Sequence, residues 1–237
     1  GHPMHAFDHK YVKGNLIDVR LAKQGEEIMT LDGVQRKLNE NMLVISDSEE
    51  PIAVAGVMGG EYSGIMDDTN TIVFESACFN GPSVRMTAKA LGMRTEASSR
   101  YEKAVDPERC DQALSLAMEL FKELYPEMKV TAFQDLYPTK LVRNEIDVEF
   151  DWLDRRLGMR IPQEVIAKKL GTMGFTVTFT ETGMHIVVPT WRSTGDVSIK
   201  ADIMEEVARM YGYENFEATT ITTSFDGAIN QLDVDLV

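Results

Sequence analysis

The chain has 237 residues, a formal net charge of −14 at pH 7 and 43% hydrophobic residues, enough to bury one large core or two modest ones. The strong negative charge argues against nonspecific binding to nucleic acid, because counterion release requires many Lys and Arg contacts. No apolar stretch approaches the length of a membrane span, and the first ten residues lack the features of a signal peptide. We therefore expect a cytoplasmic protein without a membrane partner. Two cysteines without a CxxC pair indicate neither a zinc knuckle nor a disulfide scaffold.

The first eighty residues are predicted to form strands and turns. The strand-like runs lie at 16–22, 41–47, 51–60 and 70–77, with a turn around 31–33. From Pro82 the apolar period lengthens, which predicts helices over 82–91 and 107–124. Strands followed by helices favour an α+β fold, here with a mixed sheet.

A second unit is expected after a strand-like link over 129–139. Its order of helix, helix, hairpin and helix is compact and resembles winged-helix modules, and its last helix, over 201–211, ends at Gly212. We divide the chain into a first domain over 1–142, a small winged-helix-like α+β domain over 143–216 and a tail over 217–237.

Four carboxylates fall in a short passage around the start of the last predicted helix: Asp196, Asp202, Glu205 and Glu206. Helical spacing places Asp202 and one of the two glutamates on the same side of the first turn. Hard oxygen donors in such a cluster suit Mg²⁺ better than zinc. The alternative is a local helix signal, because Asp202 and Glu205 also fit a capping box and acids in a first turn suit the helix dipole.

One strip of the sequence is basic. Between residues 85 and 103 five basic side chains face two glutamates, a net charge of +3 by that count: Arg85, Lys89, Arg94, Arg100 and Lys103 against Glu96 and Glu102. The strip could meet a phosphate backbone, and the alternative is a solvated helix face. On the first interpretation, Arg85, Lys89, Arg94 and Arg100 contact that phosphate backbone.

Six motifs occur in an order that resembles a known family. They are HAFD at 5–8, LDG at 31–33, AGVMGG at 55–60, FESACF at 74–79, LGMRTEASSRYEKAVDP at 91–107 and EEVARMYGY at 205–213. Over nearly its whole length the chain resembles the middle of the bacterial phenylalanyl-tRNA synthetase beta subunit. The first domain resembles the editing domain of that family, and the second resembles the small domain after it. Because the family's editing domain begins well upstream of HAFD, we expect an excised fragment, with 217–237 as a linker toward a missing catalytic-like core.

The resemblance implies a function. Members of the family form α2β2 heterotetramers, class II enzymes that attach phenylalanine to tRNA(Phe) with ATP and Mg²⁺ at a site in the alpha subunit. The resemblance therefore implies that this chain neither aminoacylates alone nor binds ATP or DNA. It would instead hydrolyse mischarged Tyr-tRNA(Phe), with the alpha subunit and tRNA(Phe) as partners. On this resemblance, Arg85, Lys89, Arg94 and Arg100 would contact the tRNA. A pocket for phenylalanine rejects tyrosine only partly, so a second, hydrolytic sieve is useful.

The same resemblance assigns the hydrolytic site residue by residue. Glu75 would accept a hydrogen bond from the tyrosine hydroxyl, which phenylalanine cannot donate. His5 would orient the ester or the attacking water, and Gly59 would admit substrate where a side chain would block it. Thr95 and Ala97 would line the pocket, the first holding water and the second leaving room. No Ser-His-Asp or Cys-His arrangement is evident, so we predict attack by water without a covalent intermediate.

The acidic cluster of Asp196, Asp202, Glu205 and Glu206 corresponds to the family's Mg²⁺ ligands, an ion shared with the alpha subunit. The chain departs from many relatives there, because three residues separate Arg192 from Asp196. Two other functional classes stay open. One is a noncatalytic module that binds tRNA or the alpha subunit. The other is a free-standing Mg²⁺ phosphohydrolase, against which we note that no Gly-rich phosphate loop accompanies the acids.

Overall fold

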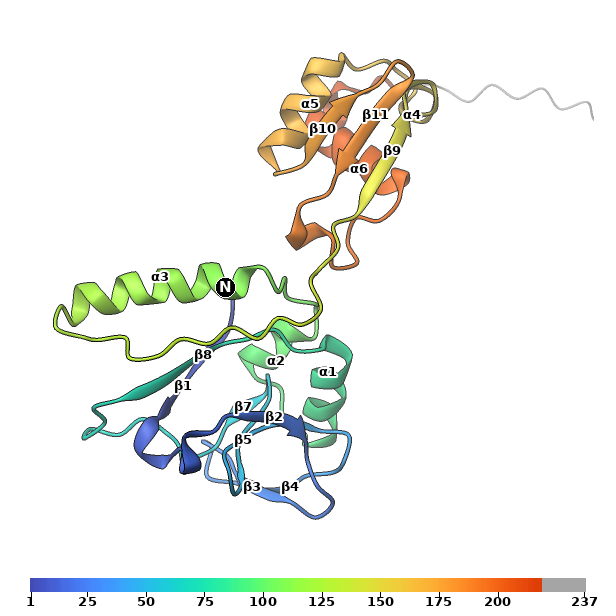
Figure 1. The fold of residues 1–237 in the computed structure, drawn as a ribbon. Helices are drawn as coiled ribbons and strands as arrows, with labels where there is room; N and C mark the ends of the chain where they lie inside the picture. Colours follow the sequence, from blue (N-terminus) through green and yellow to red (C-terminus); the bar gives the residue numbers. More distant parts are fainter. Residues whose placement is uncertain (219–237) are drawn as a thin grey trace, which may run out of the picture.

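The computed structural model describes residues 1–218, so that nearly all of the predicted tail lies outside the described residues. The first unit contains β1 (Met4–Asp8), β2 (Asp18–Leu21), β3 (Glu27–Met29), β4 (Gln35–Lys37), β5 (Leu43–Ser46), β6 (Pro51–Val54), β7 (Met58–Gly59), β8 (Ile72–Ser76), α1 (Gly81–Ala90), α2 (Glu96–Tyr101) and α3 (Arg109–Leu124). The second contains β9 (Glu145–Glu149), α4 (Phe150–Leu157), α5 (Gln163–Thr172), β10 (Thr176–Phe179), β11 (Gly183–Val187) and α6 (Lys200–Tyr211). This arrangement confirms the predicted α+β class (Figure 1). The sheets within residues 1–218 are antiparallel, where a mixed sheet was predicted.

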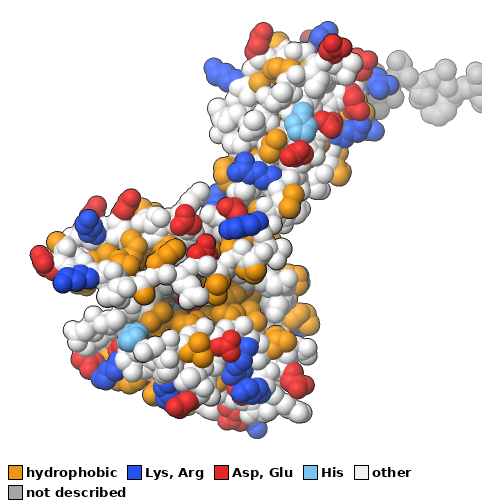
Figure 2. Space-filling view, in the orientation of Figure 1, with side chains coloured by type: hydrophobic (Ala, Val, Ile, Leu, Met, Phe, Trp, Pro, Cys, Tyr) orange, Lys and Arg blue, Asp and Glu red, His pale blue; other side chains and the backbone are white. Residues whose placement is uncertain are grey.

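The core of the first unit forms around an antiparallel sheet of order β2-β5-β6-β7. Every residue of β6 is buried, and Val44 of β5 is fully inaccessible to solvent. The short hairpin β3-β4 and the helix α1 pack close to this sheet. In the space-filling view, hydrophobic side chains gather between α3 and the sheets beneath it (Figure 2).

A separate antiparallel ribbon, β1-β8, lies between α3 and the core. Side chains alternate across a strand, so its two faces carry different residues. Phe74 packs its ring 5.3 Å from Phe121 of α3, which defines the outer face. Phe7, which is 1% exposed, belongs to the first core and defines the inner face. The residues that share the inner face with Phe7 therefore lie between the ribbon and the sheet.

The second unit has its own hydrophobic core. Its three-stranded antiparallel sheet has the order β10-β11-β9, and its helices pack on it around the fully buried Leu170, Ile186 and Ile203. The predicted order of helix, helix, hairpin and helix is present, and β9 adds a third strand through its pairing with β11. The likeness to winged-helix modules stays a prediction.

The two units are joined by residues 125–144 and also touch directly. The predicted strand-like link over 129–139 contains no strand, because this stretch joins none of the described sheets. The carboxylate of Asp106 accepts a 2.7 Å hydrogen bond from the Thr190 hydroxyl, and the Arg109 guanidinium lies 5.3 Å from the Trp191 ring centroid. None of the helices within residues 1–218 is long and apolar enough for a membrane crossing.

Candidate functional site

The ribbon brings together two predicted site residues that are seventy positions apart in the sequence. His5 of β1 and Glu75 of β8 are directly opposite in the antiparallel register, so their side chains extend from the same face. That face is the inner one, because the His5 ring lies 4.5 Å from the ring of Phe7. Because an imidazole and a carboxyl group extend from opposed positions on one face, this pair is the centre of the candidate site.

Both side chains carry a buried polar atom without a partner. Within the described part of the chain, neither His5 Nε2 nor Glu75 Oε2 makes a hydrogen bond, although both atoms are inaccessible to solvent. Buried polar atoms in folded proteins are nearly always hydrogen-bonded, and an orphaned one costs about 1–3 kcal/mol. Two such atoms on opposed residues indicate a place where a polar ligand or water binds.

Burial also changes the protonation of the pair. It raises the pKa of Glu75 to about 7, since the ionised carboxylate loses its hydration. It lowers the pKa of His5 for the same reason, since the charged imidazolium is disfavoured. Near neutral pH His5 is therefore neutral and has one acceptor nitrogen, whereas Glu75 exchanges between its neutral and ionised forms. This combination can accept protons and hydrogen bonds without forming a fixed ion pair.

Gly59 of β7 forms the surface against which the imidazole lies. A Cβ atom at this position would be 2.5 Å from His5 Cε1 and 2.7 Å from His5 Nε2. Such distances are shorter than any stable contact, so the ring occupies the space that a side chain would take. Gly59 was predicted as a position where a side chain would block substrate, and in the structure that side chain would first displace His5.

Thr95 is joined to the same region through its hydroxyl. Its Oγ1 donates to the carbonyl of Val57 at 2.8 Å and accepts from the backbone N–H of Ser98 at 3.0 Å, as the N-cap of α2. The hydroxyl proton is thus already engaged, and Thr95 ties α2 to the turn before Gly59. Its predicted role of holding a water stays a prediction. Ala97 is partly buried and packs against the first core.

Tyr101 is a supporting residue that sequence reasoning missed. Its side chain is 2% exposed, and its hydroxyl lies 2.9 Å from the carbonyl oxygen of Ala77 and 3.1 Å from that of Pro3. These carbonyls stand just after β8 and just before β1, so one phenol holds the same end of both strands. The only signal in the sequence was its place in the long 91–107 motif.

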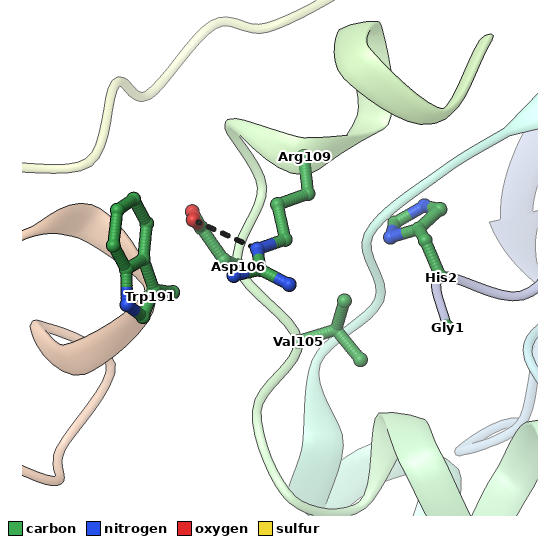
Figure 3. Close-up of a pocket in the computed structure, with 6 residues that line it drawn as sticks. All are labelled: Gly1, His2, Val105, Asp106, Arg109 and Trp191. Atoms are coloured by element: carbon green, nitrogen blue, oxygen red, sulfur yellow. Dashed lines mark ion pairs between the residues drawn. The ribbon is translucent and has the colours of Figure 1, made fainter. Parts of the chain in front are cut away.

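A second hollow lies beside this end of the ribbon, between the two units. It has a volume of about 250 Å³ and is lined by His2, Val105, Asp106, Arg109 and Trp191 together with Gly1 (Figure 3). The close-up shows His2 on one side and Trp191 on the other, with the ion pair of Asp106 and Arg109 between them. Neither His5 nor Glu75 lines this hollow.

The predicted metal ligands engage other partners. Arg192 is paired with Asp196 and with the buried Glu206, and Arg209 is also paired with Glu206. Burial alone would raise the pKa of Glu206, but the hydrogen bonds from both arginines outweigh it and hold that pKa below its ordinary value. The positive partner of this carboxylate is therefore arginine.

Asp202 caps the N-terminus of its own helix, α6. Its carboxylate accepts hydrogen bonds from the backbone N–H groups of Ser198 at 2.8 Å and Ile199 at 3.0 Å. This is the helix-capping alternative, with Asp202 reaching back from the third position of α6. No group of three or more His, Cys, Asp or Glu side chains within residues 1–218 is placed to hold a metal ion. The four carboxylates do not fit a Mg²⁺ ion in this arrangement, and an ion shared with a second subunit stays a prediction.

Three of the four predicted tRNA-contacting side chains meet in one place. Arg85 and Lys89 of α1 and Arg94, just before α2, line a cavity of about 350 Å³. Arg100 does not line it and instead pairs with Glu96 at 3.5 Å. Part of the basic strip therefore lines a groove, and the rest is a solvated helix face.

Two domain models match this chain. The B3/4 domain matches residues 1–126, and the tRNA synthetase B5 domain matches residues 146–213. The fold and these matches together define a protein built from two α+β domains, with the histidine–glutamate pair in the first. The chain belongs to the B3/4 domain family, whose model covers more than half of it.

Several curated proteins are similar over most of the chain. It is 43% identical over 234 residues to the phenylalanine–tRNA ligase beta subunit of Carboxydothermus hydrogenoformans, which covers 97% of the chain and 29% of that protein. It is 40% identical over 221 residues to the phenylalanine–tRNA ligase beta subunit of Clostridium acetobutylicum, and this match covers 93% of the chain and 28% of that protein. The chain spans less than a third of the length of these relatives.

Among solved structures, an N-terminal fragment of the phenylalanyl-tRNA synthetase beta subunit from Pyrococcus horikoshii is similar. Its TM-score is 0.47 at 15% identity, over 89% of this chain and 60% of that one.

Proposed function

We propose that the chain is part of a phenylalanine–tRNA ligase beta subunit and that its first unit hydrolyses tyrosine from mischarged tRNA(Phe). The similarity to named beta subunits supports the first statement. The observation that carries the second is the pair of opposed, buried and unpartnered polar atoms on His5 and Glu75. A site that offers polar atoms without internal partners is suited to a substrate that supplies them.

Glu75 would select tyrosine over phenylalanine. Its orphaned Oε2 accepts a hydrogen bond from the phenol hydroxyl, whereas phenylalanine leaves the atom unpaired at a cost of about 1–3 kcal/mol. That cost corresponds to a preference of roughly 5- to 150-fold. Because the pKa of Glu75 is raised to about 7, the free site can carry a proton while no substrate is bound.

His5 would orient and activate the attacking water. Its lowered pKa leaves the imidazole neutral, with an acceptor nitrogen for a proton of the water. Water adds to the ester carbonyl, the bond between that carbon and the ribose oxygen breaks, and the ribose oxygen takes up a proton. Gly59 lets the ring lie on the backbone, and Thr95 and Tyr101 hold the surrounding segments as positioning residues.

We infer the wider activity from the same similarity to named beta subunits. The complete protein would act with an alpha subunit in an α2β2 enzyme of the cytoplasm that charges tRNA(Phe) using ATP and Mg²⁺, with the ATP bound outside this chain. The second unit, which matches the B5 domain, would link the hydrolytic unit to the rest of the beta subunit. No step of the proposed hydrolysis requires the metal ion.

The test compares hydrolysis of Tyr-tRNA(Phe) and Phe-tRNA(Phe) by the complete enzyme and by its Glu75→Ala and Glu123→Ala variants. Glu123 is an exposed residue of α3, far in sequence from the pair, and serves as the matched control. We expect selective release of tyrosine by the wild type and the control, and loss of the tyrosine preference in Glu75→Ala. Normal, selective editing by Glu75→Ala would contradict the proposal. Binding of tRNA without any turnover would favour the noncatalytic module.

A further inference from the structure

The groove between α1 and α2 combines free cations with an apolar floor. It is lined by Arg85, Ala88, Lys89, Gly92, Met93, Arg94 and Glu102 and has a volume of about 350 Å³. Met93 is 8% exposed and forms part of the first core, so the floor is fixed by packing. Gly92 has a φ of +65°, and a Cβ atom added there would meet no other atom within 4 Å, so the floor is open at this position. Cations above an apolar surface suit a nucleotide, whose phosphate and base need different environments.

Two of these cations have no internal partner. Neither Arg85 nor Lys89 forms an ion pair with any described residue. They stand four positions apart on α1, where like charges repel and destabilise an isolated helix. The rest of the chain is strongly acidic, since a total of −14 that includes +3 from residues 85–103 leaves −17 elsewhere. Two neighbouring cations without an acidic partner among the described residues, in an otherwise acidic protein, suit an anionic ligand.

Arg94 connects the groove to the candidate hydrolytic site. It is followed directly by Thr95, whose hydroxyl is bonded to the carbonyl of Val57, two residues before Gly59. Thr95 thereby links the residues beside the groove to the turn before Gly59, against which the His5 ring lies. The side chain of Glu102 pairs with Arg94 at 3.1 Å and so competes with any phosphate for this arginine.

We propose that the α1–α2 groove binds a phosphodiester of the single-stranded 3′ end of the substrate tRNA and delivers the aminoacyl ester to His5 and Glu75. The inference rests on the proposed function and names the surface that holds the polynucleotide. Arg85 and Lys89 hold the phosphate, the Gly92–Met93 floor faces the ribose or base, and Glu102 limits the affinity. The groove reads no base edge, so its contribution is independent of sequence.

The test uses the complete enzyme with Arg85→Gln/Lys89→Gln and, as a control of equal charge change, Lys122→Gln/Lys129→Gln. Both control lysines are exposed and lie at and beyond the far end of α3. We expect the groove variant to raise the tRNA concentration for half-maximal hydrolysis about 3- to 10-fold while the rate at saturation is unchanged. The slope of log affinity against log salt should fall by about 0.7, as for one single-strand phosphate contact.

A third variant tests the sign of the effect. Glu102→Gln keeps the shape of the side chain but removes the competing charge, so tRNA should bind about 2- to 5-fold more tightly. A groove variant that matches the lysine control in both concentration dependence and salt slope would overturn the inference. The salt slope is measured by binding alone. It therefore decides this proposal even if the enzyme hydrolyses no ester, an outcome that would refute only the proposed function.

Discussion

Substituting Glu75→Gln should abolish a pH dependence of stability that the buried carboxyl creates. Burial raises the pKa of Glu75 from 4.5 to about 7 in the folded chain. Between these values the folded state keeps a proton that the unfolded state releases, so stability falls as the pH rises. The full difference corresponds to about 3 kcal/mol, present as extra stability below pH ~4.5 and lost above pH ~7. Glutamine has nearly the same shape and never ionises.

Native-state hydrogen exchange of the β1 and β8 amides provides the assay, because it reports the stability of this ribbon within the complete protein. Between pH 5 and pH 8 the wild type should lose about 2–3 kcal/mol more than Glu75→Gln, by the linkage relation. The pKa of His5 is lowered, so His5 contributes with the opposite sign in both proteins and largely cancels from the comparison. An exposed control, Glu123→Gln, should follow the wild type. Equal pH dependence in wild type and Glu75→Gln would refute the claim that burial controls this carboxyl.

Three further predictions concern single positions. Gly59→Ala should slow hydrolysis at least tenfold and destabilise the first unit by about 1–3 kcal/mol, because the added Cβ would overlap the His5 ring. Steady-state kinetics measures the first effect and native-state hydrogen exchange the second. Glu206→Gln should destabilise the second unit by about 2–3 kcal/mol, because its bonds to two arginines are weakened. The same change at the exposed Glu205 should leave the free energy of unfolding unchanged, and urea unfolding followed by tryptophan fluorescence measures both. The pKa of His185 is raised in the folded state, so protonated His185 stabilises the fold fully below pH 6.5 and loses this effect as the pH rises through the raised pKa. His185→Gln should remove this contribution, which the free energy of unfolding measured as a function of pH would detect.

The long periodic elements were predictable from local signals. The apolar spacing of α1, α3 and α6 gave each helix to within a few residues, and Gly212 ends α6 with a φ of +101°. The elements that escaped prediction are short. The helix α2 has six residues and a capping box closed by Ser98 in place of a glutamate. The strand β1 lies in a motif whose polar residues hide the alternation, and β4 consists of QRK without an apolar pattern.

The candidate site depends on contacts that no local pattern contains. His5 and Glu75 meet only because β1 pairs with β8 in one register, and a shift by one residue would turn either side chain to the opposite face. The family resemblance supplied these residues, but only the fold shows that the His5 ring fills the space of a side chain at Gly59 and that Thr95 bonds to Val57. Local spacing did place Asp202, Glu205 and Glu206 on the first turns of α6, although it could not choose between a metal ion and an arginine as the partner of Glu206.

The arginine pairing gives the acidic cluster a role in joining the two units. Glu206 is 4% exposed on α6 and holds Arg192, the last residue of the short 3-10 helix Thr190–Arg192. The first residue of that helix donates its hydroxyl proton to Asp106 in the first unit. The buried carboxylate of Glu206 on α6 thereby holds the short segment 190–192 that contacts the first unit. Removing one partner of a buried pair leaves an uncompensated charge, so this connection would be lost together with the pair.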